Sequence, residues 1–148
     1  LVALYYELAS VCFNLNQIEK AKQYAQKGSL IGEQLEDKDK RPAALPSLHL
    51  LVRIARNSGN KNEADYLEDK MVTIYLESAK IYPVDITAWF VDIANNLIAR
   101  NELELAVKLL RKTANRFRNR LGPSSEKAIK ADERADEIEA TLKKRKDD

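Results

Sequence analysis

The segment FVDIANNL, residues 90–97, carries the pattern that decides the fold. It places apolar residues at spacings of three and four: a large residue, an aliphatic residue next to a small one, and a further aliphatic residue. Residues at these spacings lie on one face of an α-helix. The pattern recurs with substitutions at residues 5–12 and 48–55, so the chain is predicted to repeat this helix.

A second helix is predicted after each copy, because an acidic residue and an alanine follow it at a constant distance. The three alanines are Ala21, Ala64 and Ala106, separated by 43 and 42 residues. Small side chains let two helices approach to about 8 Å. We therefore expect Ala9 to face Ala21, and Ala94 to face Ala106, in hairpins that share one register.

This arrangement resembles the tetratricopeptide repeat, a helix hairpin with a large residue, a Leu and a small residue in its first helix and a small alanine in its second. The 42–43-residue period is similar to the long repeats of kinesin light chains. The resemblance implies a right-handed α-α superhelix with hairpins at about 1–41, 42–84 and 85–123. The middle repeat departs from the pattern at Val52 and Glu68, and an ordinary helical bundle stays open as an alternative.

Composition agrees with an all-α chain. The 148 residues carry a net charge of +2, with 45% hydrophobic and 32% charged residues, four Gly and four Pro. Eight turn formers cannot supply a turn every ~8–12 residues, as an all-β fold requires, and no apolar run is long enough to span a membrane. Seven helices are predicted, at 1–14, 17–36, 43–58, 61–82, 85–100, 103–121 and 124–146.

The last of these helices has a narrow apolar stripe and charge on its other faces. The stripe consists of Ala128, Ala131, Ala135, Ile138 and Leu142. A repeat array needs a polar end helix, so residues 124–148 are predicted to cap the array; a two-stranded coiled coil for dimerisation is the alternative. The first helix starts without a capping residue, and we expect further repeats or another domain before it.

Enzymatic chemistry has little support in this sequence. Cys12 is the only cysteine and His49 the only histidine, so neither a disulfide within the chain nor a His/Cys metal set can form. We expect no catalytic site and no cofactor. The lone cysteine and the lack of a signal peptide favour a reducing compartment, taken to be the cytoplasm.

Binding is better supported, because stacked hairpins present their first helices on a concave face. His49, Arg53 and Arg56 project from one helix face, and two guanidiniums suit an acidic peptide. The alternative is that both arginines pair with Glu7 and Asp92. The full predicted groove is Tyr6, Glu7, Ser10, Phe13, Asn14, His49, Arg53, Arg56, Asn57, Asp92 and Asn95. Tyr6 and Ser10 stand where a chaperone-binding clamp has Lys and Asn, so that partner is not expected.

A second basic cluster consists of Arg111, Lys112, Arg116, Arg118 and Arg120. These residues spread over more than half of their helix, so a solvated outer face is predicted. The alternative for this cluster is a contact with nucleic acid. A further alternative for the chain as a whole is a regulatory module whose effector domain lies outside it. Four aromatic residues are predicted to pack in the core rather than to anchor a ligand: Tyr66, Tyr75, Tyr82 and Trp89.

Overall fold

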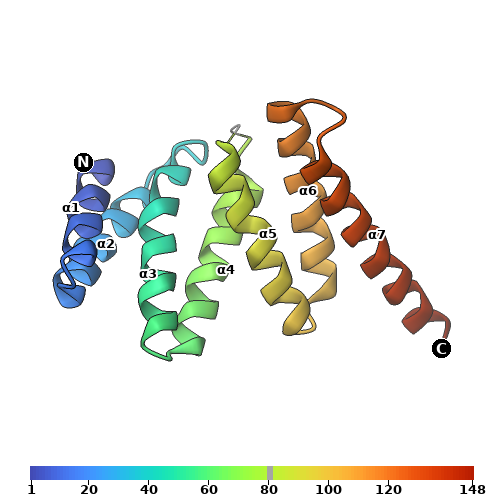
Figure 1. The fold of residues 1–148 in the computed structure, drawn as a ribbon, viewed down its shortest axis with the longest axis horizontal. Coiled ribbons are helices and arrows are strands. Elements are labelled where there is room, and N and C mark those ends of the chain that lie inside the picture. The colour runs from blue at the N-terminus through green and yellow to red at the C-terminus, as the bar shows by residue number, and fades with distance from the viewer. Residues whose placement is uncertain (80–81) are drawn as a thin grey trace. The chain divides into compact units, whose positions relative to one another are not determined.

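The structure, a computed structural model, describes residues 1–79 and 82–148, and this part of the chain contains seven α-helices, one short 3-10 helix and no strand (Figure 1). The elements are α1 (Val2–Asn14), α2 (Ile18–Glu33), η1 (Arg41–Ala44), α3 (Leu45–Asn57), α4 (Lys61–Glu77), α5 (Val84–Ala99), α6 (Leu103–Leu121) and α7 (Glu126–Asp147). The all-helical prediction and the order of the seven helices are confirmed.

The largest difference in helix length lies in α4. The predicted helix over 61–82 ends at Glu77, because Ser78 has an extended backbone. Asp39, in the loop between α2 and η1, holds this end: its Oδ1 accepts a hydrogen bond of 2.9 Å from the amide of Ala79. Residues 80–81, which the predicted helix includes, lie outside the described residues.

The chain divides into two compact units, Leu1–Ala79 and Lys80–Asp148. In the first unit α1 packs on α2 and α3 packs on α4, while α2 joins the two pairs by packing against η1 and α3. In the second unit α6 packs against both α5 and α7. Each unit therefore has its own core.

The three helix pairs α1–α2, α3–α4 and α5–α6 turn in the same way. Asn16, Gly59 and Asn101 have positive φ angles of 58°, 77° and 61°, a left-handed conformation that Gly and Asn adopt most readily. The following amide donates to the carbonyl five residues back, which closes a Schellman motif. These bonds are Gln17 to Cys12 at 2.8 Å, Asn60 to Ala55 at 2.8 Å and Glu102 to Leu97 at 2.9 Å. The turns recur with the same 42–43-residue separation as the sequence pattern.

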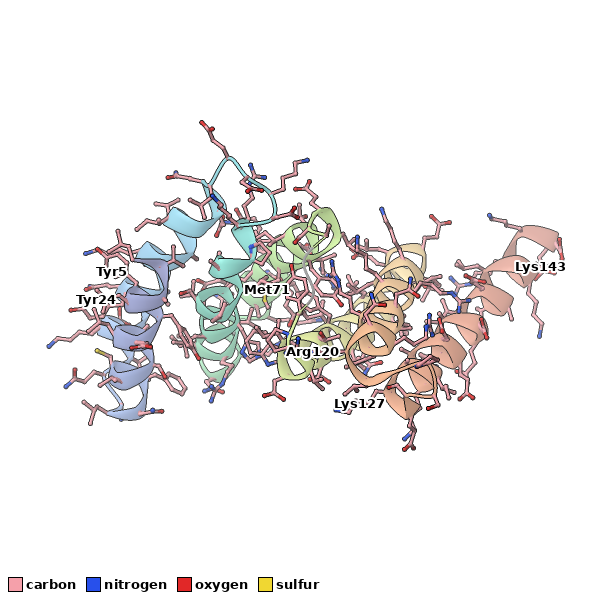
Figure 2. The ribbon with its side chains drawn as sticks, turned by 90° about the horizontal axis from the view of Figure 1, so that it is seen from above. Tyr5, Tyr24, Met71, Arg120, Lys127 and Lys143 are labelled. Atoms are coloured by element: carbon pink, nitrogen blue, oxygen red, sulfur yellow. The ribbon has the colours of Figure 1, made fainter. Side chains whose placement is uncertain are left out.

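Most motif positions are buried as predicted. Ala9, Ala21, Ala94 and Ala106 are fully buried, and the repeated positions of residues 48–55 and 90–97 are buried as well. The first copy is the exception beside Ala9: Tyr5 and Cys12 are half-buried, and Leu8 has 38% of its surface exposed. Next to it on α1, the ring of Tyr5 lies 6.3 Å from the ring of Tyr24 on α2 (Figure 2).

The aromatic prediction is correct at two of its four positions. Tyr75 and Tyr82 are buried, and Trp89 is half-buried. Tyr66 is 60% exposed, so its assignment to the core was wrong: its ring lies at the surface of α4, with the Lys70 ammonium 5.1 Å from its centroid.

Helix α7 packs along α6 and buries four of the five residues of its apolar stripe, while Leu142 is half-buried. Ala128, Ala131, Ala135 and Ile138 are all buried, and Ser125 caps the helix by accepting a hydrogen bond from the amide of Ala128 at 3.3 Å. Because the stripe is covered within the chain, the capping interpretation is favoured over a coiled coil with a second chain.

Candidate functional site

In the first unit two of the predicted groove residues, Phe13 and Arg53, contact each other. The guanidinium of Arg53 on α3 lies 4.9 Å from the ring centroid of Phe13 on α1. Arg53 is exposed, and in the described part of the chain it forms no ion pair. The stacking restrains the guanidinium while leaving its N–H donors available to a carboxylate.

Arg56 pairs with a carboxylate inside its own hairpin and not with a residue of the predicted groove. Its Nη2 pairs with the carboxylate of Glu68 on α4 and lies 3.9 Å from Asp65. Glu68 is only 3% exposed, so its departure from the apolar pattern is compensated inside the hairpin. Within the described residues neither Arg53 nor Arg56 pairs with Glu7, and only Arg53 is left for an external anion.

The other groove residues of this unit differ in how far they reach solvent. Three of them are half-buried and three are exposed: Tyr6, Ser10 and His49 belong to the first group, and Glu7, Asn14 and Asn57 to the second. None of these six residues lines either of the two pockets of the second unit, which are described next. The contact between Arg53 and Phe13 is therefore the main feature of the predicted groove in the first unit.

The second unit contains a pocket of about 310 Å³ between α5, α6 and α7. It takes in Asp92 and Asn95 of the predicted groove, together with Ala88 and Val91 from the same face of α5. We call it the α5–α7 pocket; its lining is Ala88, Val91, Asp92, Asn95, Leu110, Phe117, Lys127, Lys130, Ala131 and Arg134.

The floor of the α5–α7 pocket is apolar and its rim is mostly cationic. Leu110 and Phe117 are buried at the base, and the Lys127 ammonium lies 5.8 Å from the Phe117 ring centroid. Lys130 and Arg134 add two more cations, against the single carboxylate of Asp92. Such a pocket favours an anionic ligand with an apolar side chain.

Two of the rim cations pair with exposed carboxylates on their own helix. Lys130 pairs with Glu126 at 2.9 Å and Arg134 with Glu137 at 3.0 Å. The hydrogen bond from Lys130 lowers the pKa of Glu126, and the same bond raises the pKa of Lys130. Both pairs lie in solvent, where water and salt screen the attraction, so a ligand carboxylate can replace Glu126 or Glu137 at small cost.

A second hollow of about 390 Å³ shares Arg134 with this pocket. We call it the end pocket; it is lined by Ile98, Asn101, Leu103, Arg134, Glu137, Ile138, Thr141 and Arg145. Arg145 donates to Asn101 at 3.0 Å across it. Together the two hollows run along the length of α7 that faces α5 and α6.

The α7 wall of this site was missed by sequence reasoning. Its charges were interpreted as those of a solvated capping helix, whereas Lys127, Lys130 and Arg134 line a pocket. The available signal was their i, i+3 and i+7 spacing, which puts three cations on one helix face beside Ala131.

The basic cluster of α6 is largely engaged inside the second unit, contrary to the prediction of a solvated face. Arg111 pairs with Asp132 at 3.0 Å and with Glu139 at 3.2 Å, and Arg118 also pairs with Asp132. Arg116 is buried, with its guanidinium 4.5 Å from the ring centroid of Tyr82. The cluster therefore serves mainly to attach α7 and to build the core.

The α6–α7 ion pairs predict an acid-sensitive attachment of α7. Burial raises the pKa of Asp132, but hydrogen bonds from Arg118 and Arg111 outweigh it and hold the pKa below its ordinary value of about 3.9. A lowered folded-state pKa gives stability that is present above the unfolded-state pKa and is lost as pH falls through the folded-state pKa. We expect Asp132→Asn to lower the free energy of unfolding by about 1 kcal/mol near neutral pH. The substitution should have no effect at a pH where the wild-type carboxyl is protonated.

Urea unfolding followed by the fluorescence of Trp89, the only tryptophan, measures this effect in the second unit. Glu133→Gln, on the exposed side of α7, is the control and should leave the midpoint unchanged. If the free energies of unfolding of the wild type and Asp132→Asn differ by the same amount down to strongly acidic pH, the ionised carboxylate of Asp132 does not stabilise the attachment of α7.

None of the described helices is long and apolar enough to cross a membrane. Among the described residues no group of three or more His, Cys, Asp or Glu side chains is arranged to hold a metal ion. No protein-family model and no curated protein matches the chain. The likeness to tetratricopeptide repeats therefore depends on the residues and on the geometry of this chain alone.

Proposed function

We propose that the chain is a non-enzymatic protein-interaction scaffold, a right-handed tetratricopeptide-like solenoid that binds a peptide along its first helices. Three equal turns at Asn16, Gly59 and Asn101, in the same register as the sequence repeat, support the repeat architecture. In such an array α1, α3 and α5 line the binding face. The predicted groove residues belong to these three helices.

The observation that carries the proposal is the α5–α7 pocket, with its apolar floor and three cations at the rim. Its volume of about 310 Å³ is at the small end of the range for ligand sites and fits one or two side chains rather than a large cofactor. The ligand class is an acidic peptide segment with an apolar anchor: the anchor enters between Val91 and Phe117, and its carboxylates meet Lys127 and Arg134.

Direct binding tests this proposal. The probe is a fluorescein-labelled peptide of about ten residues with one central Leu flanked by Asp and Glu, and fluorescence anisotropy measures its affinity. We expect Lys127→Glu and Arg134→Glu each to weaken binding about tenfold, equivalent to about 1.4 kcal/mol. Lys143→Glu, exposed near the end of the same helix (Figure 2), is the matched control and should bind as the wild type does.

Two further peptides separate the contributions of charge and of the anchor. Replacing the acids by Asn and Gln should abolish the dependence on Lys127, and replacing the central Leu by Gly should weaken binding to all variants equally. If Lys127→Glu and Arg134→Glu bind the acidic peptide with the same affinity as the wild type does, the α5–α7 pocket is not the peptide-binding site.

The nucleic-acid alternative gains no support from the arrangement of α6, because Arg111, Arg116 and Arg118 are engaged within the second unit. Charge reversal at these three positions should act on stability rather than on retention by heparin or RNA.

A further inference from the structure

One face of α1 carries a continuous row of exposed apolar side chains. The row follows the helix from its N-cap to its C-cap, and none of its side chains is charged. We call it the α1 stripe: Leu1 (73% exposed), Leu4 (55%), Leu8 (38%), Val11 (56%) and Leu15 (64%). The only charged residue in α1 is Glu7, which lies outside the stripe.

The same helix face is a packing surface in the next repeat. Shifted by 43 residues, the first four stripe positions become Ala44, Ser47, Leu51 and Ile54, and all four are buried. This face of α3 and η1 lies against α2: a Cβ atom added to Gly28 would lie 2.8 Å from Ser47 Oγ, and one added to Gly32 would lie 2.7 Å from Ala44 Cβ. The α1 stripe thus has the register of a face that packs against a helix.

The spacing of the stripe specifies what can cover it. Successive members are three, four, three and four residues apart, which is the a/d spacing by which two helices pair along a common seam. An uncharged row of this kind is complementary to itself, because each Leu can lie against the Leu or Val side chains of an identical helix. The polar free side of α7 offers no comparable row.

The exposed area is sufficient for such a pair. The exposed fractions of the five side chains correspond to about 500 Å² of apolar surface, which is in the upper part of the range for the largest apolar patch on a monomer, a kind of patch that is often functional. Two copies would bury about 1,000 Å² in total, the lower limit for a specific protein interface.

We propose that two copies of this chain associate through their α1 stripes in a two-fold symmetric dimer. Each copy covers the other's five apolar side chains, so the interface closes on itself and does not propagate. The stripe lies on the side of α1 opposite Phe13, which contacts Arg53 of α3. The dimer therefore leaves that contact unaltered, and the proposal does not depend on the proposed peptide binding.

Light scattering after size exclusion and sedimentation equilibrium test the dimer, with protein concentrations up to about 100 µM. We expect the wild type to approach twice its chain mass of 16.8 kDa. Leu4→Glu and Val11→Glu should each shift the chain to the monomer, because a dimer would bury two unpaired carboxylates. Circular dichroism verifies that both variants keep the helical content of the wild type.

Leu30→Glu on α2 is the matched control. Leu30 is 55% exposed, as Leu4 is, but it lies outside the stripe, so this variant should remain dimeric. A wild-type chain that is monomeric at about 100 µM overturns the proposal and points to a different helix as the occupant of the stripe. A dimer that persists in Leu4→Glu and Val11→Glu overturns it as well.

Discussion

Replacing Arg56 by Met is expected to destabilise the first unit by about 2 kcal/mol, because it removes the guanidinium that pairs with the buried carboxylate of Glu68. Glu68 is 3% exposed and pairs with Arg56. Loss of one partner from a fully buried ion pair costs about 3–5 kcal/mol. The expected cost is lower here because the side chain of Arg56 is 38% exposed and water reaches the pair.

Removing the acid of the pair instead of the cation should change the stability much less. In Glu68→Leu the buried position receives the apolar side chain that the repeat pattern favours there, and Arg56 keeps Asp65 and water as partners. We expect a change below about 1 kcal/mol. The double variant Arg56→Met/Glu68→Leu should recover most of the stability that Arg56→Met loses, since no buried charge remains.

Urea unfolding followed by circular dichroism gives these free energies, and hydrogen exchange of α3 and α4 locates the effect in the first unit. Arg53→Met is the matched control on the same helix face, because Arg53 only stacks on Phe13 and its loss should cost about 0.5–1 kcal/mol. Equal costs for Arg56→Met and Glu68→Leu, with no recovery in the double variant, would show that Arg56 does not compensate the charge of Glu68.

The helix order and the turns could be predicted because they depend on neighbouring residues. Asn16, Gly59 and Asn101 stand at the positions where a left-handed residue must end a helix, and these residue types tolerate that conformation. The buried alanines follow from the same local register. Helix ends that depend on distant groups were less accurate: α4 ends at Glu77, and the loop residue Asp39 binds the amide of Ala79.

The candidate site was predicted less well, because side-chain partners come from other helices. Arg56 was assigned to the groove from its angle on α3 alone, yet its partner is Glu68, the one acid at an apolar position of the repeat. A buried acid requires a cation on the facing helix, so this departure from the pattern already contained the information. Lys127 and Arg134 were missed because their charge was interpreted without the pocket that α6 forms beneath them.

Gly32→Ala is expected to destabilise the first unit by about 2 kcal/mol, although alanine favours a helix by up to about 1 kcal/mol over glycine. A Cβ atom on Gly32 would lie 2.7 Å from Ala44 Cβ and 3.0 Å from both the Cα and the N atom of Ala44. Two of these neighbours are backbone atoms, so a rotamer change cannot relieve the contact. Helix α2 and the 3-10 helix η1 have to move apart, which disturbs the packing between the two hairpins of this unit.

Gly28→Ala provides the comparison on the same face of α2. Its added Cβ would lie 2.8 Å from Ser47 Oγ and 3.1 Å from Tyr5 Cβ. The Ser47 hydroxyl can rotate, so we expect a cost below that of Gly32→Ala, and Ser47→Ala should remove most of it.

Ala44→Gly should likewise recover part of the loss in Gly32→Ala, because it removes the closest of the three contacts. Urea unfolding followed by circular dichroism measures all of these variants. If Gly32→Ala proves as stable as the wild type, or more so, then α2 and η1 do not approach as closely as described, and the packing face assigned to α3 and η1 loses its support.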